Sequence, residues 1–594
     1  LSAVFIPTAF ISGLTGQFYK QFALTIAIST IISTFNSLTL SPALAAALLK
    51  PHDGKKDLLS RLIDGLFGKI IFKPFNYFFG GLTKFYSATL KRVVRGSAVV
   101  LILYAGLMAI TYEQFQSTPS GFVPPQDKMY LIAFAQLPDA ANLDRTEAVI
   151  RQMSALALEH PGVESSVAFP GLSINGFTNS SNAGVVFVTL KPFSERKGEA
   201  NSADAISMQL NQKFGVIQDA FVLVIPPPPV LGLGTTGGFK LQVEDRANHG
   251  YEALYNETQK VVNMAWGTPG LTGIFSSFQV NVPQLHVEVD REKAKVHGVA
   301  INEIFETLQV YMGSVYVNDL NLFGRTYQVN VQADQQFRVD ETQISKLKIR
   351  NQHGDMVPLG AFITVSHSAG PDRVMHYNGF PAADINASPA GVSSGQAQAI
   401  MSKLLDENLP EGMEYEWTDL TYQQILAGNT ALYIFPLVVL LVFLVLAAQY
   451  ESWSLPMSII LIVPMTLLSA MTGVILDGGD NNIFTQIGLI VLVGLATKNA
   501  ILIVEFAKEK EDQGLSIKEA VFEASRLRLR PILMTSLAFI MGVVPLVLSS
   551  GAGAEMRHAM GVAVFSGMIG VTFFGLMLTP VFYVLMRKIS GKRN

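Results

Sequence analysis

Lys498 is the residue whose position most clearly calls for chemistry. It lies near the middle of the apolar run Ile483–Ala507, within the sequence Gly494-Leu-Ala-Thr-Lys-Asn-Ala. A lysine at the centre of a membrane helix costs about 2.5–3.5 kcal/mol on insertion scales, so it must face a carboxylate or water inside a helix bundle. Lys498 is therefore predicted to couple ion movement to transport, with a structural ion pair as the alternative. Glu505, two helical turns further on, is interpreted as an interfacial charge.

Arg528 and Thr535 are candidates for the same chemistry on the next apolar run. They are seven residues apart, so they share one helix face. Thr535 could bond a carboxylate or relay water, or it could bond its own helix. Arg528 could instead anchor the helix end at the membrane surface. No Asp or Glu lies near the middle of any apolar run, so the carboxylate partner of Lys498 is expected on spans that precede this chain.

Seven apolar runs are long enough to cross about 30 Å of hydrocarbon. Between Lys50 and Arg95 there are ten basic and three acidic residues, whereas the turn Asp477–Asn482 has no basic residue. Basic loops stay in the cytoplasm. Residues 50–96, with an interfacial helix at Phe67–Phe85, and the tail 587–594 are therefore assigned to the cytoplasm. Residues 1–11 are interpreted as the end of a further transmembrane helix in a truncated chain. The seven expected spans are Phe22–Leu49, Ala98–Phe115, Ala431–Ala448, Leu455–Leu476, Ile483–Ala507, Pro531–Leu548 and Ala559–Met586.

The composition excludes several classes of protein. Hydrophobic residues make up 49% of the 594 and charged residues only 15%, which favours a membrane protein over a soluble enzyme. The net charge of −3 does not indicate nucleic-acid binding. The absence of Cys excludes disulfides and thiolate metal sites. No Walker A motif, zinc signature or nucleophile elbow is present, so neither ATP hydrolysis nor a metal site is expected.

Residues 116–428 have the patterning of soluble α+β structure. Strand, helix and strand are predicted at Met129–Leu137, Leu143–Leu158 and Val163–Phe169, and again at Gly184–Leu190, Ser202–Phe214 and Ala220–Ile225. This βαβ–βαβ order is that of a split ferredoxin-like unit. The same order recurs on either side of an inserted α+β segment at about 280–381. Pro226–Pro229 is interpreted as a stiff connector, since proline cannot donate to a strand ladder.

These motifs resemble the C-terminal portion of resistance-nodulation-division (RND) multidrug transporters of the hydrophobe/amphiphile class. The resemblance covers essentially the whole chain. Within the class, the segments from Ala168 to Asn179 and from Pro226 to Gly234 are similar to the MexF/OqxB-like branch. The most specific sequences are Gly494-Leu-Ala-Thr-Lys-Asn-Ala-Ile-Leu-Ile-Val-Glu-Phe-Ala507 and Arg528-Leu-Arg-Pro-Ile-Leu-Met-Thr-Ser-Leu-Ala-Phe539, with Tyr450-Glu-Ser-Trp453, Tyr316-Val-Asn-Asp319 and Leu40-Ser-Pro-Ala43 in support.

The resemblance implies a homotrimer in the bacterial inner membrane that exchanges protons for small amphiphilic drugs. It also implies a periplasmic adaptor protein and an outer-membrane channel as partners, with the proton-motive force in place of a cofactor. The four spans and the periplasmic loop that would precede this chain are expected to carry the paired Asp residues, so the chain alone is expected to be inactive. The implied regions are porter subdomains at 116–235 and at 236–281 with 382–425, a funnel or docking subdomain at 282–381, and five transmembrane helices within 431–586.

The resemblance also implies roles for individual residues. Lys498, Asn499, Arg528 and Thr535 correspond to the proton-coupling residues. Pro170–Asn182 corresponds to a gating loop of about 14 residues, in which Pro170, Gly171, Gly176 and Asn182 are singled out. Phe275 and Gly232 stand where well-studied relatives carry Arg and Glu, so a less charged outer pocket is expected. The implied substrate-binding residues are Ile132, Phe134, Val167, Phe169, Leu172, Ile174, Phe177, Phe187, Leu223 and Phe275, each of which could instead be ordinary core.

Three other functions remain as alternatives. A non-transporting membrane scaffold has no reason to keep a lysine in mid-membrane. A metal-exporting relative should show acidic or Met ligands within the spans. Another transporter of the same superfamily, such as a protein-translocation accessory, should have much smaller external domains.

Overall fold

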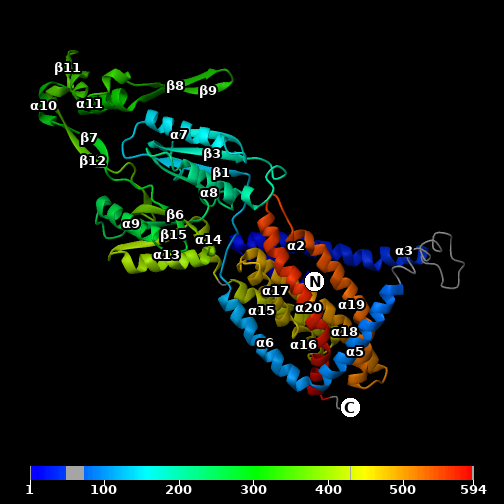
Figure 1. The fold of residues 1–594 in the computed structure, drawn as a ribbon. Helices are drawn as coiled ribbons and strands as arrows, with labels where there is room; N and C mark the ends of the chain where they lie inside the picture. Colours follow the sequence, from blue (N-terminus) through cyan, green and yellow to red (C-terminus); the bar gives the residue numbers. More distant parts are fainter. Residues whose placement is uncertain (1, 49–72, 429, 592–594) are drawn as a thin grey trace.

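The chain folds into two bodies that are joined at one end of a helix bundle (Figure 1). The computed structural model describes residues 2–48, 73–428 and 430–591. Residues 116–428 form an elongated α+β body, and the long apolar helices form the bundle. The expected cytoplasmic segment therefore falls partly outside the described residues, as do Leu1 and residues 592–594 of the tail.

Within the described residues, seven helical segments are long and apolar enough to cross a membrane. Each of the seven expected spans overlaps one of them. The segments are α2 (Gly13–Leu38) with α3 (Leu40–Leu48), α6 (Ser97–Ser117), α15 (Thr430–Tyr450), α16 (Ser454–Ile460) with α17 (Val463–Leu476), α18 (Ile483–Asp512), α19 (Ile517–Val547) and α20 (Ala554–Ile589).

Helix α19 begins much earlier than the sequence pattern predicts. The expected span started at Pro531, but the helix starts after Ser516, whose hydroxyl accepts a hydrogen bond from the backbone N–H of Glu519. Pro531 and Pro545 both lie inside the helix. Proline removes one hydrogen bond from a helix. Here the helix nevertheless continues through both positions.

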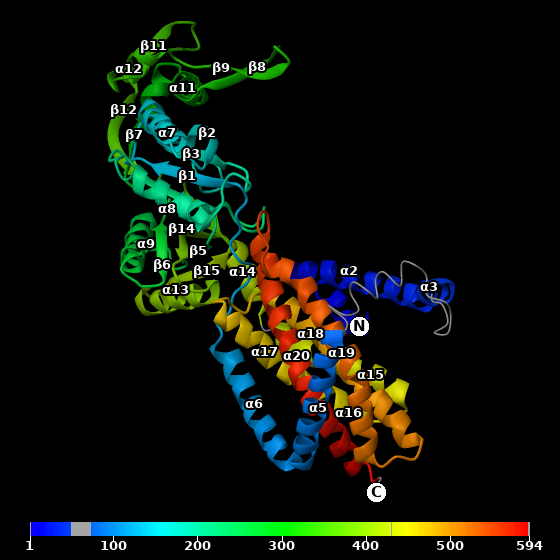
Figure 2. The same cartoon turned by 45° about the vertical axis from the view of Figure 1, so that its right-hand side comes forward.

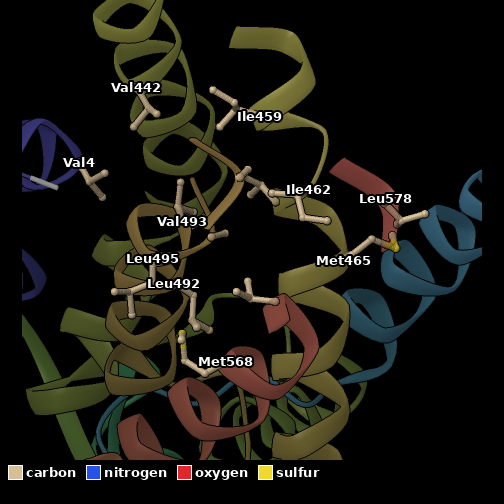
Figure 3. Packing of buried hydrophobic residues seen from close by; sticks show 14 of the residues in the cluster. Val4, Val442, Ile459, Ile462, Met465, Leu492, Val493, Leu495, Met568 and Leu578 are labelled. Atoms are coloured by element: carbon tan, nitrogen blue, oxygen red, sulfur yellow. The ribbon is translucent and has the colours of Figure 1, made fainter. Parts of the chain in front are cut away.

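Helices α18 and α20 form the centre of the bundle and pack closely. Most residues of α18 are buried, and glycines of α20 allow the approach. A Cβ added to Gly567 would lie 2.3 Å from Cδ1 of Leu492, so any larger residue would displace the Leu492 side chain. Small residues at such crossings let membrane helices pack by van der Waals contact. Figure 3 shows part of this apolar packing, with Leu492 next to Met568.

The N-terminal segments lie at the edge of the bundle. Instead of one helix end over residues 1–11, the structure has α1 (Ser2–Phe5) and the 3₁₀ turn η1 (Pro7–Phe10). Only the first half of α2 is packed, where the Tyr19 hydroxyl donates to Oε1 of Gln486 at 2.8 Å. Helices α2 and α3 then extend away from the bundle in both views (Figures 1 and 2). Helix α5 (Lys73–Arg95) continues past the expected interfacial helix, which lies partly outside the described residues, and packs onto the bundle.

The first α+β unit has a four-stranded antiparallel sheet with two helices on one face. The strand order is β2-β3-β1-β4. Alternation along β1 puts Leu131, Ala133 and Ala135 against the helices, while Ile132 and Phe134 face the other way. The elements are β1 (Tyr130–Gln136), α7 (Leu143–Leu158), β2 (Val163–Leu172), β3 (Asn179–Leu190), α8 (Ala203–Phe214) and β4 (Phe221–Ile225).

The second α+β unit repeats this connectivity. Strands β6, β14, β5 and β15 pair in that order, the same as in the first unit. Helix α13 begins with a capping box formed by Ser393 and Gln396, which satisfies free N–H groups of its first turn. The elements are β5 (Phe239–Asp245), α9 (Tyr251–Trp266), β6 (Leu271–Phe275), β14 (Phe380–Pro389), α13 (Ser394–Asn408) and β15 (Met413–Thr418), followed by α14 (Asp419–Ala427).

An outer domain is inserted between β6 and β14. Strands β7 (Val282–Val289) and β12 (Ile363–Gly370) form a two-stranded antiparallel stem, paired from Val282 with Gly370 to Val289 with Ile363. Beyond the stem, a small core surrounds α11 (Ile301–Leu308). The hairpin of β8 (Val315–Leu322) and β9 (Arg325–Val331) projects from this domain with almost every residue exposed (Figure 2).

Candidate functional site

The polar residues predicted within the membrane helices lie on two neighbouring helices. Lys498 and Asn499 belong to α18, and Arg528 and Thr535 belong to α19. Asn499 is buried, and its Nδ2 donates a hydrogen bond to Oγ of Ser536 at 3.1 Å. Ser536 was not among the predicted residues, although it directly follows Thr535 in the same motif. The structure therefore joins the two helices through Asn499 and Ser536.

Arg528 and Thr535 are engaged in other ways. The Arg528 guanidinium lies over the ring of Phe506, 3.2 Å from its centroid, while its Nε is buried without a hydrogen-bond partner among the described residues. The Thr535 hydroxyl is 3.0 Å from the carbonyls of Pro531 and Ile532 in its own helix. Thr535 therefore adopts the alternative in which its hydroxyl bonds its own helix. Arg528 is held by an aromatic face that the sequence pattern did not indicate.

Lys498 points out of the packed part of the bundle. Its side chain is exposed, whereas its neighbours Thr497 and Asn499 are buried. In the part of the chain that the structure describes, no ion pair or hydrogen bond is found for the Lys498 ammonium group. Thr535 is also exposed. The structure leaves the Lys498 ammonium group free to meet a partner that the described chain does not supply.

A second polar cluster joins α18 to α20 at the end of the bundle away from the α+β body. Glu511 accepts hydrogen bonds from Nε of Arg587 at 2.9 Å and from the hydroxyl of Tyr583 at 2.8 Å. All three side chains are largely shielded, so this is a nearly buried ion pair. Arg587 was predicted to lie in a cytoplasmic tail. The basic residues around it do not indicate that one of them is buried.

Most of the predicted substrate-binding residues form one apolar cluster between the two α+β units. Ile132, Phe134, Ile174 and Phe275 are buried in it, and Leu172, Phe187 and Leu223 pack against it. The rings of Phe134 and Phe275 are 4.5 Å apart between centroids. Val167, Phe169 and Phe177 are exposed, although the last two rings lie 5.8 and 6.4 Å from that of Phe187. Seven of the ten residues are thus brought together, as a packed cluster in this conformation.

The expected gating loop is shorter than predicted. Strand β2 continues to Leu172 and β3 starts at Asn179, and the pairs Pro170–Gly184 and Leu172–Asn179 extend the ladder. Only residues 173–178 form the turn. The prediction of a 14-residue loop was wrong because Gly, Ser and Asn suppress the strand signal, whereas the ladder bonds use only the backbone. Gly171 and Gly176 do have positive φ, at 81° and 67°.

The tip of this hairpin is bonded to the second α+β unit. Asn175 accepts a hydrogen bond from Nζ of Lys240 at 2.7 Å and donates to Oγ of Ser277 at 2.8 Å. Asn182 donates to Oε1 of Gln279 at 2.9 Å, and Arg373 donates to Thr178. No local sequence pattern predicted these contacts. They make the turn a bridge between the two units.

A cavity of about 450 Å³ lies in the cleft where the two units meet the bundle. Of the predicted residues only Leu223 lines it. Its walls also include prolines of the linker from Pro226 to Pro229 and one side of α8 from Asp204 to Asn211. It is largely apolar with a few polar groups, as is usual for sites that bind small organic molecules. Within the described residues, no cluster of three or more His, Asp or Glu side chains could hold a metal ion.

Comparison with known proteins identifies relatives over the whole length of the chain. Residues 1–587 match the AcrB/AcrD/AcrF family. The chain is 39% identical to the multidrug export protein AcrF of Escherichia coli K12, over 99% of this chain and 56% of that protein. It is 38% identical to the multidrug resistance protein MdtF of Escherichia coli O157:H7 and 37% identical to the multidrug/solvent efflux pump membrane transporter MepB of Pseudomonas putida, over 100% of this chain and 56% of each relative. The chain therefore spans just over half the length of these relatives.

Proposed function

Because this chain belongs to the AcrB/AcrD/AcrF family, we propose that it forms part of a multidrug efflux transporter of the inner membrane, which exports amphiphilic drugs in exchange for protons. The observation that carries this proposal is the arrangement around Lys498. A lysine on a membrane helix, exposed beside the buried contact of Asn499 with Ser536, is placed to meet a carboxylate from outside the described bundle. Such intramembrane charges mark proton and ion pathways.

The two α+β units are suited to act as porter subdomains on the periplasmic side. Each has the split βαβ connectivity of a ferredoxin-like unit. The apolar cluster around Phe134 and Phe275 and the cavity of about 450 Å³ lie between the units or at their edge. Opening and closing of this interface would expose or remove an apolar site for drugs. The hairpin turn at 173–178 is the proposed gate, since the bonds of Asn175 to Ser277 and Lys240 of the second unit must change when the units separate.

The outer domain, reached through the β7–β12 stem, is the proposed docking region for a periplasmic adaptor protein and an outer-membrane channel. Its β8–β9 hairpin is exposed along its length, with Tyr316, Leu320 and Phe323 among the apolar side chains on its surface. A homotrimer is proposed as the working assembly. Membership of the MexF/OqxB-like branch is part of the same proposal.

The proposal is tested by drug susceptibility. The full-length native gene, which includes the coding sequence of this chain, would be expressed in a bacterial strain deleted for its own efflux pumps, together with its adaptor and channel, and the inhibitory concentrations of a drug panel measured. An increase for several amphiphilic drugs that disappears with a protonophore is expected. Unchanged susceptibility with correctly inserted protein would contradict the proposed function.

A further inference from the structure

Two cavities meet at the junction between the helix bundle and the α+β body. The first, called the junction cavity, has a volume of about 340 Å³ and lies among the ends of α17, α18 and α20. The second, called the cleft cavity, is the cavity of about 450 Å³ in the cleft between the α+β units. Pro124 and Asp480 line both. Asp480, in the turn between α17 and α18, therefore stands where a molecule would leave one cavity and enter the other.

Both cavities are lined by acids and by no lysine or arginine. Asp477, Asp480 and Glu555 line the junction cavity together with His558, and Asp204 and Asp480 line the cleft cavity. Two nearby cationic side chains, Lys128 and Arg196, do not line either cavity and already have partners. Nζ of Lys128 donates to the carbonyl of Pro229 at 2.7 Å, and the side chain of Arg196 forms a 2.9 Å ion pair with Asp127.

His558 balances only one of the three acids of the junction cavity. Its Nε2 is 2.8 Å from Oδ2 of Asp477, and its Nδ1 is 2.7 Å from the carbonyl of Val547. Both ring nitrogens thus face oxygen acceptors. Two such contacts need both N–H groups, which only the imidazolium carries. Asp477 is thereby paired with His558, whereas Asp480 and Glu555 are not.

The remaining two carboxylates lack a cation among the described residues. Oε1 of Glu555 accepts a hydrogen bond from the backbone N–H of Asp127 at 3.1 Å, but its Oε2 is buried with no partner there. Asp480 accepts from Nδ2 of Asn482 at 2.7 Å, and burial raises the pKa of its carboxyl group. A buried carboxylate oxygen without a donor is costly, so a positively charged ligand in the cavity would relieve that cost.

We propose that the junction cavity binds the ammonium group of a cationic amphiphile between Asp480 and Glu555, and that Asp480 passes this group on to the cleft cavity. Apolar side chains beside the acids, including Val474, Ala559 and Val562, would cover the ligand's hydrocarbon part. The prolines and Leu223 of the cleft cavity continue this apolar surface. This inference rests on the proposed export function and adds a substrate class to it.

The test compares a cationic and a neutral probe. Protein produced from its native gene would be purified in an uncharged detergent and titrated with rhodamine 6G and with Nile red. We expect Asp480→Asn and Glu555→Gln each to weaken rhodamine 6G binding about tenfold, and Nile red binding less than about twofold. Glu113 is an exposed acid near the C-terminal end of α6 and does not line either cavity. Glu113→Gln is therefore the matched control, with no change expected in the binding of either probe. Equal rhodamine 6G affinity in wild type and Asp480→Asn would overturn the proposal.

Three further measurements keep the outcomes separate. Asp480→Asn retains an oxygen for Asn482, so its melting temperature should match that of the wild type and a folding defect would be visible. Displacement of rhodamine 6G by phosphatidylethanolamine as readily as by dodecyltrimethylammonium would assign the site to a lipid headgroup and overturn the substrate role. In cells, Asp480→Asn should lose resistance to cationic drugs and keep resistance to neutral ones. Loss of both classes would overturn the cation-specific role, whereas failure of the wild type to export either class would contradict the proposed function itself.

Discussion

The amide of Asn499 and the hydroxyl of Ser536 form a buried hydrogen bond of 3.1 Å between α18 and α19. Each residue directly follows an exposed polar residue, Lys498 on one helix and Thr535 on the other. The bond therefore fixes the relative height of the two exposed groups. A carboxylate that approached this face would meet the ammonium and the hydroxyl in a defined geometry.

The Asn499–Ser536 bond should contribute measurably to stability. Hydrogen bonds between membrane helices average about 0.6 kcal/mol in double-mutant cycles and reach about 1.7 kcal/mol. A cycle with Asn499→Ala and Ser536→Ala is expected to give a coupling energy in this range, measured by unfolding in detergent. Thr535→Val is the control, since its hydroxyl bonds only its own helix, and its stability should stay within about 0.5 kcal/mol of wild type. A coupling energy of zero would contradict the role of the bond.

Replacement of Lys498 should remove export without unfolding the protein. An opposite charge within about 4–6 Å lowers a carboxylate pKa, so the lysine would keep a neighbouring carboxylate ionised at the pH of the cell. Lys498→Ala is expected to abolish drug resistance with expression and melting temperature nearly unchanged, because the side chain is exposed. Lys508→Ala, which breaks only a surface ion pair with Asp512 on the same helix, should export normally. Normal resistance in Lys498→Ala would leave the lysine a structural role only.

Residues 1–594 produced alone are expected to export no drug. The reason is that the Lys498 ammonium has no carboxylate partner in the described chain, so no proton site is formed there. Accumulation of a fluorescent substrate in cells that make only this chain should equal that of cells with an empty vector. Active efflux by the chain alone, sensitive to a protonophore, would refute this expectation and the assignment of the missing partner.

The turn at 173–178 should govern the passage of large substrates more than folding. Gly171 and Gly176 have positive φ, where alanine is strained, so replacement of both should cost about 1–2 kcal/mol in total. A Cβ at Gly171 would also approach Cδ1 of Leu143 to 3.0 Å. We expect Gly171→Ala with Gly176→Ala to reduce export of large drugs selectively. Gly354→Ala, at φ 90° in an open loop of the outer domain, is the control for strain alone. Equal loss for all drugs with a collapsed melting temperature would mean that the turn is structural.

Phe275 should behave as core in the resting protein. Its ring is 8% exposed and contacts that of Phe134, so Phe275→Ala should lower the free energy of unfolding by about 3–5 kcal/mol. Phe275→Leu, which keeps most of the volume, should cost under about 1.5 kcal/mol. Phe305→Ala, at an exposed site of the outer domain, is the control. A loss below about 1 kcal/mol for Phe275→Ala, with altered drug selectivity, would instead mark a pocket wall that is open in solution.

Local signals in the sequence predicted the elements better than their ends. Helix α7 has the predicted bounds, because its apolar period is regular and Asn142 caps its first turn. Strands β2 and β3 run further than predicted, because the ladder continues through Gly, Ser and Asn, which carry little strand propensity. The start of α19 was missed because Pro531 resembles the first residue of a helix. The strand order matches the predicted split βαβ units, whereas the register depends on contacts between distant segments.

The candidate site was predictable only where a single residue was unusual in its surroundings. Lys498 is such a residue, because a charge in an apolar run is conspicuous. Ser536 is not, since serine is common in membrane helices and only its contact with Asn499 gives it a role. The acids of the junction cavity were equally hidden. Asp480 and Glu555 are 75 positions apart in the sequence and meet only through the packing of α17, α18 and α20.

Pro531 has no N–H, so the carbonyl of Leu527 lacks its usual donor one turn earlier in α19. Arg528 lies within this turn and Thr535 lies about one turn beyond it, both on one face of the helix. A helix without proline would have to break the main-chain hydrogen bond from residue 531 to residue 527 in order to bend at this turn. In α19 that bond is already absent. Bending there changes the separation of the arginine and the threonine while Ser536 stays attached to Asn499. Pro531 thus lets the part of α19 that carries Arg528 bend, while the bond from Asn499 to Ser536 holds the part that carries Thr535.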